Sequence, residues 1–245
     1  MIRESAPTQA FASGYTPIES SELLYKIFRG ETRLVRSIIE QSGFAYTESH
    51  DWNVLWSNGG CKTYLYEGLN EHQKINHFPS SNEITRKDRL CQNVVRMQDR
   101  FGKAIFDFIP DTYVLPDQFG DFISHFQKLK AATGGDPRRN LWIVKPANLS
   151  RGRGIYLIDD VNEVSVEETS VISRYISNPL LINGHKFDLR LYVVVTSLEP
   201  LRVYIYKEGL ARFASEEYIG SKVSKDNMYV HLTNYSINKK NDKFV

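Results

Sequence analysis

The chain has 245 residues and a mass of 28.3 kDa, enough to bury a hydrophobic core in one or two domains. Hydrophobic residues make up 41% and charged residues 24% of it, and 14 Tyr and 13 Phe are present, so the composition excludes an intrinsically disordered chain. The formal net charge of +2 disfavours a nucleic-acid binder. Two widely spaced cysteines, Cys61 and Cys91, predict neither a disulfide framework nor a metal-ligand set, and they favour a reducing compartment.

The N-terminal sequence lacks the apolar segment of a signal peptide, and no apolar run has the length needed to span a bilayer. We therefore expect a cytoplasmic protein without a membrane partner. Residues 1–20, which are polar and rich in Ser, Thr and Pro, predict a flexible lead-in.

The next segments predict a small α/β domain over residues 21–75. Apolar residues recur at helical spacing from about residue 21 to 41, and Gly43 follows as a stop signal. Residues 53–56 and 62–66 predict two short strands on either side of the Gly59-Gly60 turn.

Residues 76–140 predict a central region with two helices, and residues 141–245 predict a strand-rich region. The helices are expected over 85–101 and 118–131, with a strand over 104–115 that is broken at Pro110 and a loop over 132–140. The strands are expected over 141–145, 155–158, 170–176, 187–196, 201–206 and 210–214. The unbroken β-branched run over 191–196 predicts a strand that is buried on both faces.

A strand that ends in a lysine and is followed by a basic glycine loop is the first candidate site. Leu141-Trp-Ile-Val-Lys145 carries the cation at its tip, and Arg151-Gly-Arg-Gly154 follows at once. Glycine lets the backbone approach phosphate oxygens, and lysine and arginine neutralise their charge. The alternative is an ordinary hairpin with a basic tip.

A second candidate site begins at Lys186-Phe-Asp-Leu-Arg190. The two-residue period of a strand places Lys186, Asp188 and Arg190 on one face, where buried charge needs a partner or a ligand. The alternative is an ion-pair ladder in which Lys186 and Arg190 flank Asp188.

Three further segments carry weaker signals. Arg212 could grip a carboxylate with two prongs, although a surface arginine is the simpler interpretation. His231-Leu-Thr-Asn-Tyr-Ser236 offers small polar groups for oxyanions or, alternatively, a capped turn. Arg86, Lys87 and Arg89 lie in a predicted first helical turn, where the helix dipole disfavours cations unless an acidic partner is present. One interpretation is that these cations form a surface for an acidic target, and the alternative is a solvated face.

Eight segments together resemble the tubulin tyrosine ligase-like family of ATP-grasp ligases, and most closely its polyglutamylase branch. In chain order they are His77-Phe-Pro79, Thr85-Arg-Lys-Asp-Arg89, Trp142-Ile-Val-Lys-Pro146, Arg151-Gly-Arg-Gly154, Ser173-Arg-Tyr-Ile176, Lys186-Phe-Asp-Leu-Arg190, Gly209-Leu-Ala-Arg-Phe213 and His231-Leu-Thr-Asn-Tyr-Ser236. The resemblance implies an ATP-grasp-like α/β fold with a small N-terminal α/β domain, a central domain and a C-terminal part that is truncated here.

The resemblance also implies roles for individual residues. Lys145 and Arg151 would be catalytic, with Lys145 on the phosphates of ATP and Arg151 in the loop above them. The implied nucleotide-binding set is Lys145, Arg151, Gly152, Ser173, Arg174, Tyr175, Ile176, Lys186, Phe187, Asp188, Asn234 and Tyr235. The implied substrate-binding set is Arg212, Tyr235 and Ser236 for free L-glutamate, with Arg86, Lys87 and Arg89 for the acidic tail of tubulin.

The implied activity is ATP-dependent ligation of glutamate to the γ-carboxylates of tubulin tail glutamates through an acyl phosphate. Mg²⁺ would accompany ATP, and its ligands are expected beyond Val245, so we expect an N-terminal fragment or short isoform. The alternative is a non-catalytic module that binds tubulin tails. We expect a monomer that acts on microtubules in the cytoplasm and cytoskeleton, including the cilium and the centriole or basal body.

Overall fold

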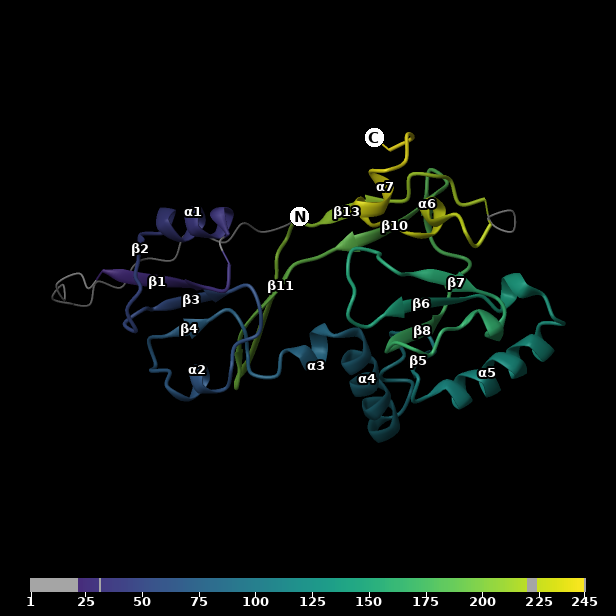
Figure 1. The fold of residues 1–245 in the computed structure, drawn as a ribbon, viewed down its shortest axis with the longest axis horizontal. Helices are drawn as coiled ribbons and strands as arrows, with labels where there is room; N and C mark the ends of the chain where they lie inside the picture. The colour runs from purple at the N-terminus through teal and green to yellow at the C-terminus, as the bar shows by residue number, and fades with distance from the viewer. Residues whose placement is uncertain (1–21, 31, 220–223, 245) are drawn as a thin grey trace, which may run out of the picture. The chain divides into compact units, whose positions relative to one another are not determined.

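The computed structural model describes residues 22–30, 32–219 and 224–244. The predicted lead-in over 1–20 lies outside these residues. The chain divides into two compact units, Met1–Ser81 and Asn82–Val245, which are described separately (Figure 1). The finer domain boundaries at residues 75 and 140 stay predictions.

The first unit is a parallel α/β sheet. Its elements are β1 (Leu23–Phe28), α1 (Arg33–Gln41), β2 (Phe44–Tyr46), β3 (Val54–Ser57), α2 (Tyr64–Glu67) and β4 (Lys74–Ile75). The strand order is β2-β1-β3-β4, and every pairing is parallel.

The helix predicted over 21–41 is wrong in its first half, where strand β1 is found. Arg29 and Gly30 adopt left-handed backbone angles, with φ of 58° and 107°, and this turn separates β1 from α1. Tyr25 in β1 is fully buried, and its hydroxyl donates a 2.7 Å hydrogen bond to Glu40 of α1. Pairing with two neighbouring strands therefore overrides the helical spacing of the apolar residues.

The strand predicted over 62–66 is also wrong, because this segment forms helix α2. β3 and β4 are parallel, and parallel neighbours need a crossover connection, which α2 supplies. The strand predicted over 53–56 is confirmed as β3.

The second unit begins with helices and continues as antiparallel sheets. Its elements are α3 (Asn82–Thr85), α4 (Lys87–Phe101), β5 (Thr112–Leu115), α5 (Phe119–Ala132), η1 (Pro137–Arg139), β6 (Trp142–Pro146), β7 (Tyr156–Ile158), η2 (Val161–Glu163), β8 (Ser170–Arg174), β9 (Leu181–Ile182), β10 (His185–Arg190), β11 (Val193–Leu198), β12 (Leu201–Ile205), β13 (Leu210–Phe213), α6 (Met228–His231) and α7 (Tyr235–Asn238). Both predicted long helices are confirmed as α4 and α5.

A four-stranded antiparallel sheet, ordered β5-β8-β6-β7, carries a core on each face. On one face, α5 contributes Phe122 and Phe126 to a cluster with Trp142 of β6. On the other face, Ile143 of β6 packs with Val230 of α6. Since side chains alternate along a strand, Lys145 shares the face of Ile143 and points toward the α6 side.

The predicted strand over 187–196 is interrupted and forms parts of β10 and β11. β10 joins a second sheet ordered β13-β10-β9, whereas β11 pairs with β12 in a two-stranded hairpin. The prediction that 191–196 is buried on both faces is wrong, because Val193 and Val194 are 56% and 54% exposed. Their β-branched side chains favour a strand, but burial also needs a covering layer, which the described residues do not supply here.

Among the described residues, no helix is both long enough and apolar enough to cross a lipid bilayer.

Candidate functional site

Lys145 is the cation at the tip of β6, and it is partly buried. No ion pair links it to a carboxylate within the described part of the chain. Burial and the nearby charge of Lys87 both lower the pKa of Lys145. Such a lysine binds an anion favourably, because the anion would compensate for the lost solvation and offset the repulsion from Lys87.

Lys87 lies at the start of α4, where its ammonium supports the loop that follows β6. Its Nζ donates hydrogen bonds to the carbonyls of Pro146, at 3.1 Å, and Leu149, at 2.5 Å. Burial lowers the pKa of Lys87. Lys87 therefore fixes the backbone that leads from β6 into the predicted phosphate loop at 151–154. The sequence did not indicate this contact.

The two arginines beside Lys87 have acidic partners. Arg86 forms a two-pronged contact with Asp88, at 3.1 and 2.8 Å, and Arg89 pairs with Glu83 at 3.4 Å. Asp88 is only 6% exposed. The acidic partners that cations in a first helical turn require are thus present.

The basic loop after β6 packs against the segment that contains α7. Arg151, Gly152 and Gly154 have positive φ of 61°, 77° and 65°. The Ser236 hydroxyl donates a 2.6 Å hydrogen bond to the carbonyl of Arg151. Two motifs separated by 85 residues in the sequence, the loop and Thr233-Asn-Tyr-Ser236, are in this way brought together.

Strand β10 brings a second lysine close to Lys145. The Nζ of Lys186 donates a 2.9 Å hydrogen bond to the hydroxyl of Tyr175. Burial and the charge of Lys145 lower the pKa of Lys186 to about 8, against an opposing effect of Asp188. Lys145 and Lys186 thus converge from two sheets on one region.

Asp188 and Arg212 form an ion pair across the second sheet. They are register partners on β10 and β13, and Arg212 Nε donates to Asp188 Oδ1 at 2.9 Å while a second guanidinium nitrogen contacts Oδ2. Arg212 and Thr233 lower the pKa of the Asp188 carboxyl, whereas burial raises it. The alternative prediction placed Lys186 and Arg190 on either side of Asp188 along one strand. Asp188 instead forms its ion pair with Arg212 on the neighbouring strand.

The segment at 173–176, which the resemblance assigns to the hinge beside the adenine of ATP, sends its side chains in different directions. Ser173 accepts a 3.1 Å hydrogen bond from Thr112 of β5, while the Tyr175 hydroxyl contacts Lys186. Arg174 and Ile176 are exposed and, together with Tyr175, line a polar cavity of about 590 Å³. The structure therefore brings only Tyr175 of this set into side-chain contact with Lys186.

Two of the remaining predicted residues line a cavity of about 720 Å³. Arg212 and Tyr235 line it together with Phe213, against which Phe187 packs with ring centroids 5.8 Å apart. Neither Lys145 nor Lys186 is part of its lining. Asn234 lies next to Gly152, at the point where the basic loop meets α7.

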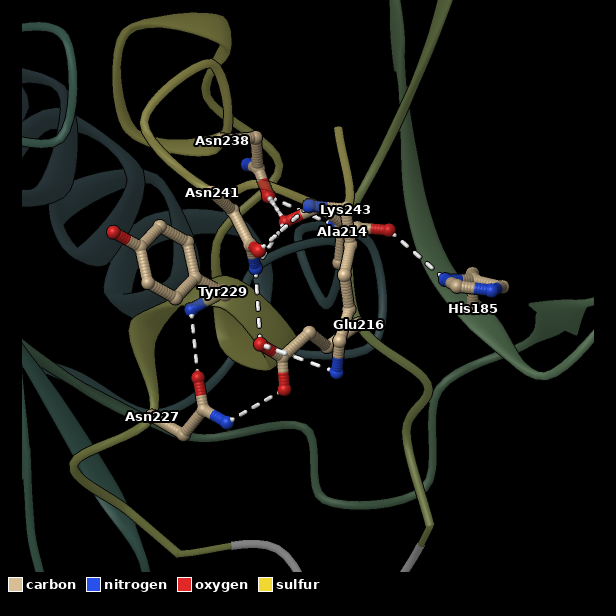
Figure 2. A network of polar contacts seen from close by, with 9 residues as sticks. His185, Ala214, Glu216, Asn227, Tyr229, Asn238, Asn241 and Lys243 are labelled. Atoms are coloured by element: carbon tan, nitrogen blue, oxygen red, sulfur yellow. Dashed lines mark hydrogen bonds and ion pairs between the residues drawn. The ribbon is translucent and has the colours of Figure 1, made fainter. Parts of the chain in front are cut away.

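A polar network that the sequence did not single out fixes this region (Figure 2). Asn238 is fully buried; its Oδ1 accepts hydrogen bonds from the amide and hydroxyl of Ser215, both at 2.8 Å. Its Nδ2 donates to the carbonyls of Leu232, at 2.8 Å, and Asn234, at 3.1 Å.

Glu216 belongs to the same network. Its carboxylate accepts hydrogen bonds from Asn227 and Asn241, which lowers the pKa of this carboxyl. The sequence signal for this network is the recurrence of Asn at positions 227, 234, 238 and 241 near charged residues.

No group of three or more His, Cys, Asp or Glu side chains within residues 22–30, 32–219 and 224–244 is arranged to hold a metal ion.

Comparison with known proteins places these features in a family. The model of the tubulin-tyrosine ligase family matches residues 66–244. The chain is 47% identical over 229 residues to mouse tubulin polyglutamylase TTLL5, 42% identical over 236 residues to Caenorhabditis elegans tubulin polyglutamylase ttll-5, and 41% identical over 230 residues to mouse tubulin monoglutamylase TTLL4. Each match covers 93% of this chain but only 17%, 32% and 18% of the respective relative. The chain belongs to the tubulin-tyrosine ligase family.

Proposed function

We propose that this chain is the ATP-binding portion of a tubulin polyglutamylase. The observation that carries the proposal is a pair of partly buried lysines, Lys145 and Lys186. Burial lowers the pKa of both, the charge of Lys87 further lowers that of Lys145, and the charge of Lys145 further lowers that of Lys186. A polyphosphate would remove that unfavourable repulsion. The basic loop at 151–154 follows the end of β6, the strand that carries Lys145, and would cover the phosphates.

The proposed reaction is a two-step ligation. A γ-carboxylate oxygen of a tubulin tail glutamate attacks the γ-phosphorus of ATP, and ADP leaves, which produces an acyl phosphate. The amino group of free L-glutamate then attacks the acyl carbon, loses a proton and displaces phosphate, which forms the isopeptide bond. Lys145, Lys186 and Arg151 would stabilise the charge that develops on the transferring phosphoryl oxygens.

We assign the nucleotide and the amino acid to neighbouring regions. The adenosine would lie beside the hinge at 173–176, Lys186 and Phe187, and free glutamate would approach Arg212, Asn234, Tyr235 and Ser236. The cavity of about 720 Å³ beside Arg212 supports the second assignment. Asp188 would keep the guanidinium of Arg212 in a fixed orientation. Magnesium would accompany ATP, and we assign it no ligand among the described residues.

The proposed target is the acidic tail of tubulin in microtubules, at the cytoskeleton and in cilia or centrioles. The names of the relatives from mouse and Caenorhabditis elegans support tubulin as the substrate. Among the cations predicted to meet the tail, Arg86, Lys87 and Arg89 already have partners within their own unit. We therefore assign the first contact with the tail to Arg151, which has no acidic partner among the described residues.

ATP binding and glutamate ligation test this proposal together. The chain should bind ATP, as measured by isothermal titration calorimetry, and Lys145→Ala should abolish binding without lowering the melting temperature. Arg212→Ala should abolish incorporation of labelled glutamate into tubulin while ATP binding is kept. Equal loss of both activities in Arg212→Ala would make this arginine structural, and retained ATP affinity in Lys145→Ala would refute the phosphate site. Tubulin binding by a chain that takes no ATP would instead support the non-catalytic alternative.

A further inference from the structure

Three groups outside the lysine pair form a continuous chain of hydrogen bonds that ends on Lys186. His231 of α6 is only 4% exposed, and its Nε2 lies 3.0 Å from the carbonyl oxygen of Ser224. Its Nδ1 lies 2.8 Å from the hydroxyl of Tyr175, which in turn receives the 2.9 Å hydrogen bond from Lys186.

The chemistry of these groups gives the chain one direction. A carbonyl oxygen can only accept, so Nε2 of His231 carries the proton and donates to Ser224. Nδ1 is then an acceptor, and the Tyr175 hydroxyl donates to it. The lone pairs of the Tyr175 oxygen are left facing the Lys186 ammonium, which can only donate. Burial lowers the pKa of His231, which keeps the neutral ring that this arrangement needs.

The charges around Lys186 explain why such a tether matters. Lys145 on β6 repels its ammonium, while Asp188, two residues along β10, attracts it. Without a fixed acceptor, Lys186 would move from Lys145 toward Asp188, which also binds Arg212. The Tyr175 ring adds a second constraint, because Lys186 Nζ lies 4.3 Å from its centroid.

We propose that His231 and Tyr175 are positioning residues, in which His231 orients the Tyr175 hydroxyl so that its oxygen holds the Lys186 ammonium beside Lys145. This inference rests on the proposed nucleotide site, because it states how that site keeps two like charges together before the phosphates arrive. Neither residue needs to touch the nucleotide through its polar atoms to have this effect.

A comparison of variants with and without Lys186 separates positioning from general stability. Tyr175→Phe and His231→Leu should each weaken ATP binding about tenfold, the equivalent of one lost charge-assisted hydrogen bond. In the background of Lys186→Met, the same two substitutions should change ATP affinity less than about twofold, because the group they position is gone. His231→Asn, whose amide oxygen can replace Nδ1 as acceptor, should recover part of the loss.

Tyr113→Phe is the matched control. The hydroxyl of Tyr113 on β5 lies 2.7 Å from Nδ1 of His125, so it makes the same kind of tyrosine–histidine contact, but it belongs to the core on the α5 side of the sheet. Removing this hydroxyl should leave ATP affinity unchanged. Equal losses of affinity in the wild-type and Lys186→Met backgrounds would show that Tyr175 and His231 act only through the fold, and would overturn the proposal.

A measurement without nucleotide distinguishes failure of the tether from failure of the proposed function. The pH profile of Lys186 acetylation by acetic anhydride, followed by mass spectrometry, reports how readily this ammonium loses its proton. In Tyr175→Phe the profile should move down by about one pH unit, because the charged form loses its acceptor. If the wild-type chain binds no ATP but the profile moves, the nucleotide site is wrong and the tether stands. An unmoved profile in folded Tyr175→Phe would sink the tether.

Discussion

Gly152 lies so close to Ile237 that a methyl group at its Cβ position would be 2.3 Å from the Cδ1 atom of Ile237. The same methyl group would be 3.1 Å from the side-chain oxygen of Asn234. Two motifs that the sequence presents separately are therefore packed against one another at this point. Glycine is required here both by the close approach and by the φ of 77°.

Gly152→Ala should accordingly destabilise the chain. The left-handed backbone alone costs about 1–2 kcal/mol for a residue with a Cβ, and the contact with Ile237 adds to this. Differential scanning calorimetry should show a melting temperature lower by roughly 3–6 °C. Gly120→Ala, a helical position where a Cβ meets nothing within 4 Å, should leave the melting temperature equal or higher.

The double variant Gly152→Ala, Ile237→Ala separates the two costs. When Ile237 is already alanine, adding Gly152→Ala should lower the free energy of unfolding only by the cost of the left-handed backbone, because the steric contact with Ile237 is gone. A Gly152→Ala protein as stable as the wild type would mean that the loop does not pack on α7 as described.

Lys87 and Arg89 belong to the same predicted basic cluster, but they should respond differently to loss of charge. Lys87→Met removes the donor for the carbonyls of Pro146 and Leu149, so amide hydrogen exchange over residues 150–155 should accelerate about tenfold. Arg89→Met removes only an exposed ion pair with Glu83 and should leave exchange in that loop unchanged. Equal exchange rates in the two variants would contradict the support of the loop by Lys87.

The stability of the chain should increase with pH above about pH 8 because of Lys186. Its folded pKa of about 8 lies below the ordinary 10.5, so the unfolded chain binds more protons between these values. The free energy of unfolding should therefore rise with pH, by up to about 1.4 kcal/mol per pH unit for one group. Below pH 8 the lysine is charged in both states, and this dependence disappears. Lys145, whose pKa is also lowered, contributes in the same direction.

Urea unfolding from pH 7 to about 9.5, below the ordinary pKa of tyrosine, measures this slope. Lys186→Met should be more stable than the wild type at pH 7, and its slope should be smaller. Equal slopes in Lys186→Met and the wild type would mean that Lys186 is not desolvated.

Asn238 should be among the most costly polar residues to replace. Asn238→Ala would leave the buried amide of Ser215 and the carbonyl of Leu232 without their partner, at a cost of roughly 2–4 kcal/mol. Asn148, which is exposed and has no hydrogen bond through its side chain in the described structure, is the matched control and should tolerate alanine. Comparable urea midpoints for the two variants would show that the network in Figure 2 does not stabilise the segment.

Local pattern was enough to predict several elements and the family. The aromatic spacing over 118–131 predicts α5 because every turn of that helix meets the same core. The apolar run that leads to Lys145 predicts a strand, which is confirmed as β6, and this strand contributes Trp142 and Val144 to that core. The helix predicted over 21–41 is confirmed over 33–41 as α1, but it is wrong over 23–28, because a helix and a central parallel strand both accept apolar residues at these positions. The strand state was decided by β2 and β3, which lie elsewhere in the sequence.

The sequence by itself determined the types of groups at the site: a strand-tip lysine, a basic glycine loop, and a strand with alternating charges. Only the tertiary structure decided their partners. Asp188 binds Arg212 because of antiparallel register, Lys87 turns to backbone carbonyls, and Asn238 connects segments that no short-range pattern joins. The physical reason is that the composition of a segment governs which contacts it can make, whereas hydrogen bonds and ion pairs form with whatever the packed chain brings within about 3 Å.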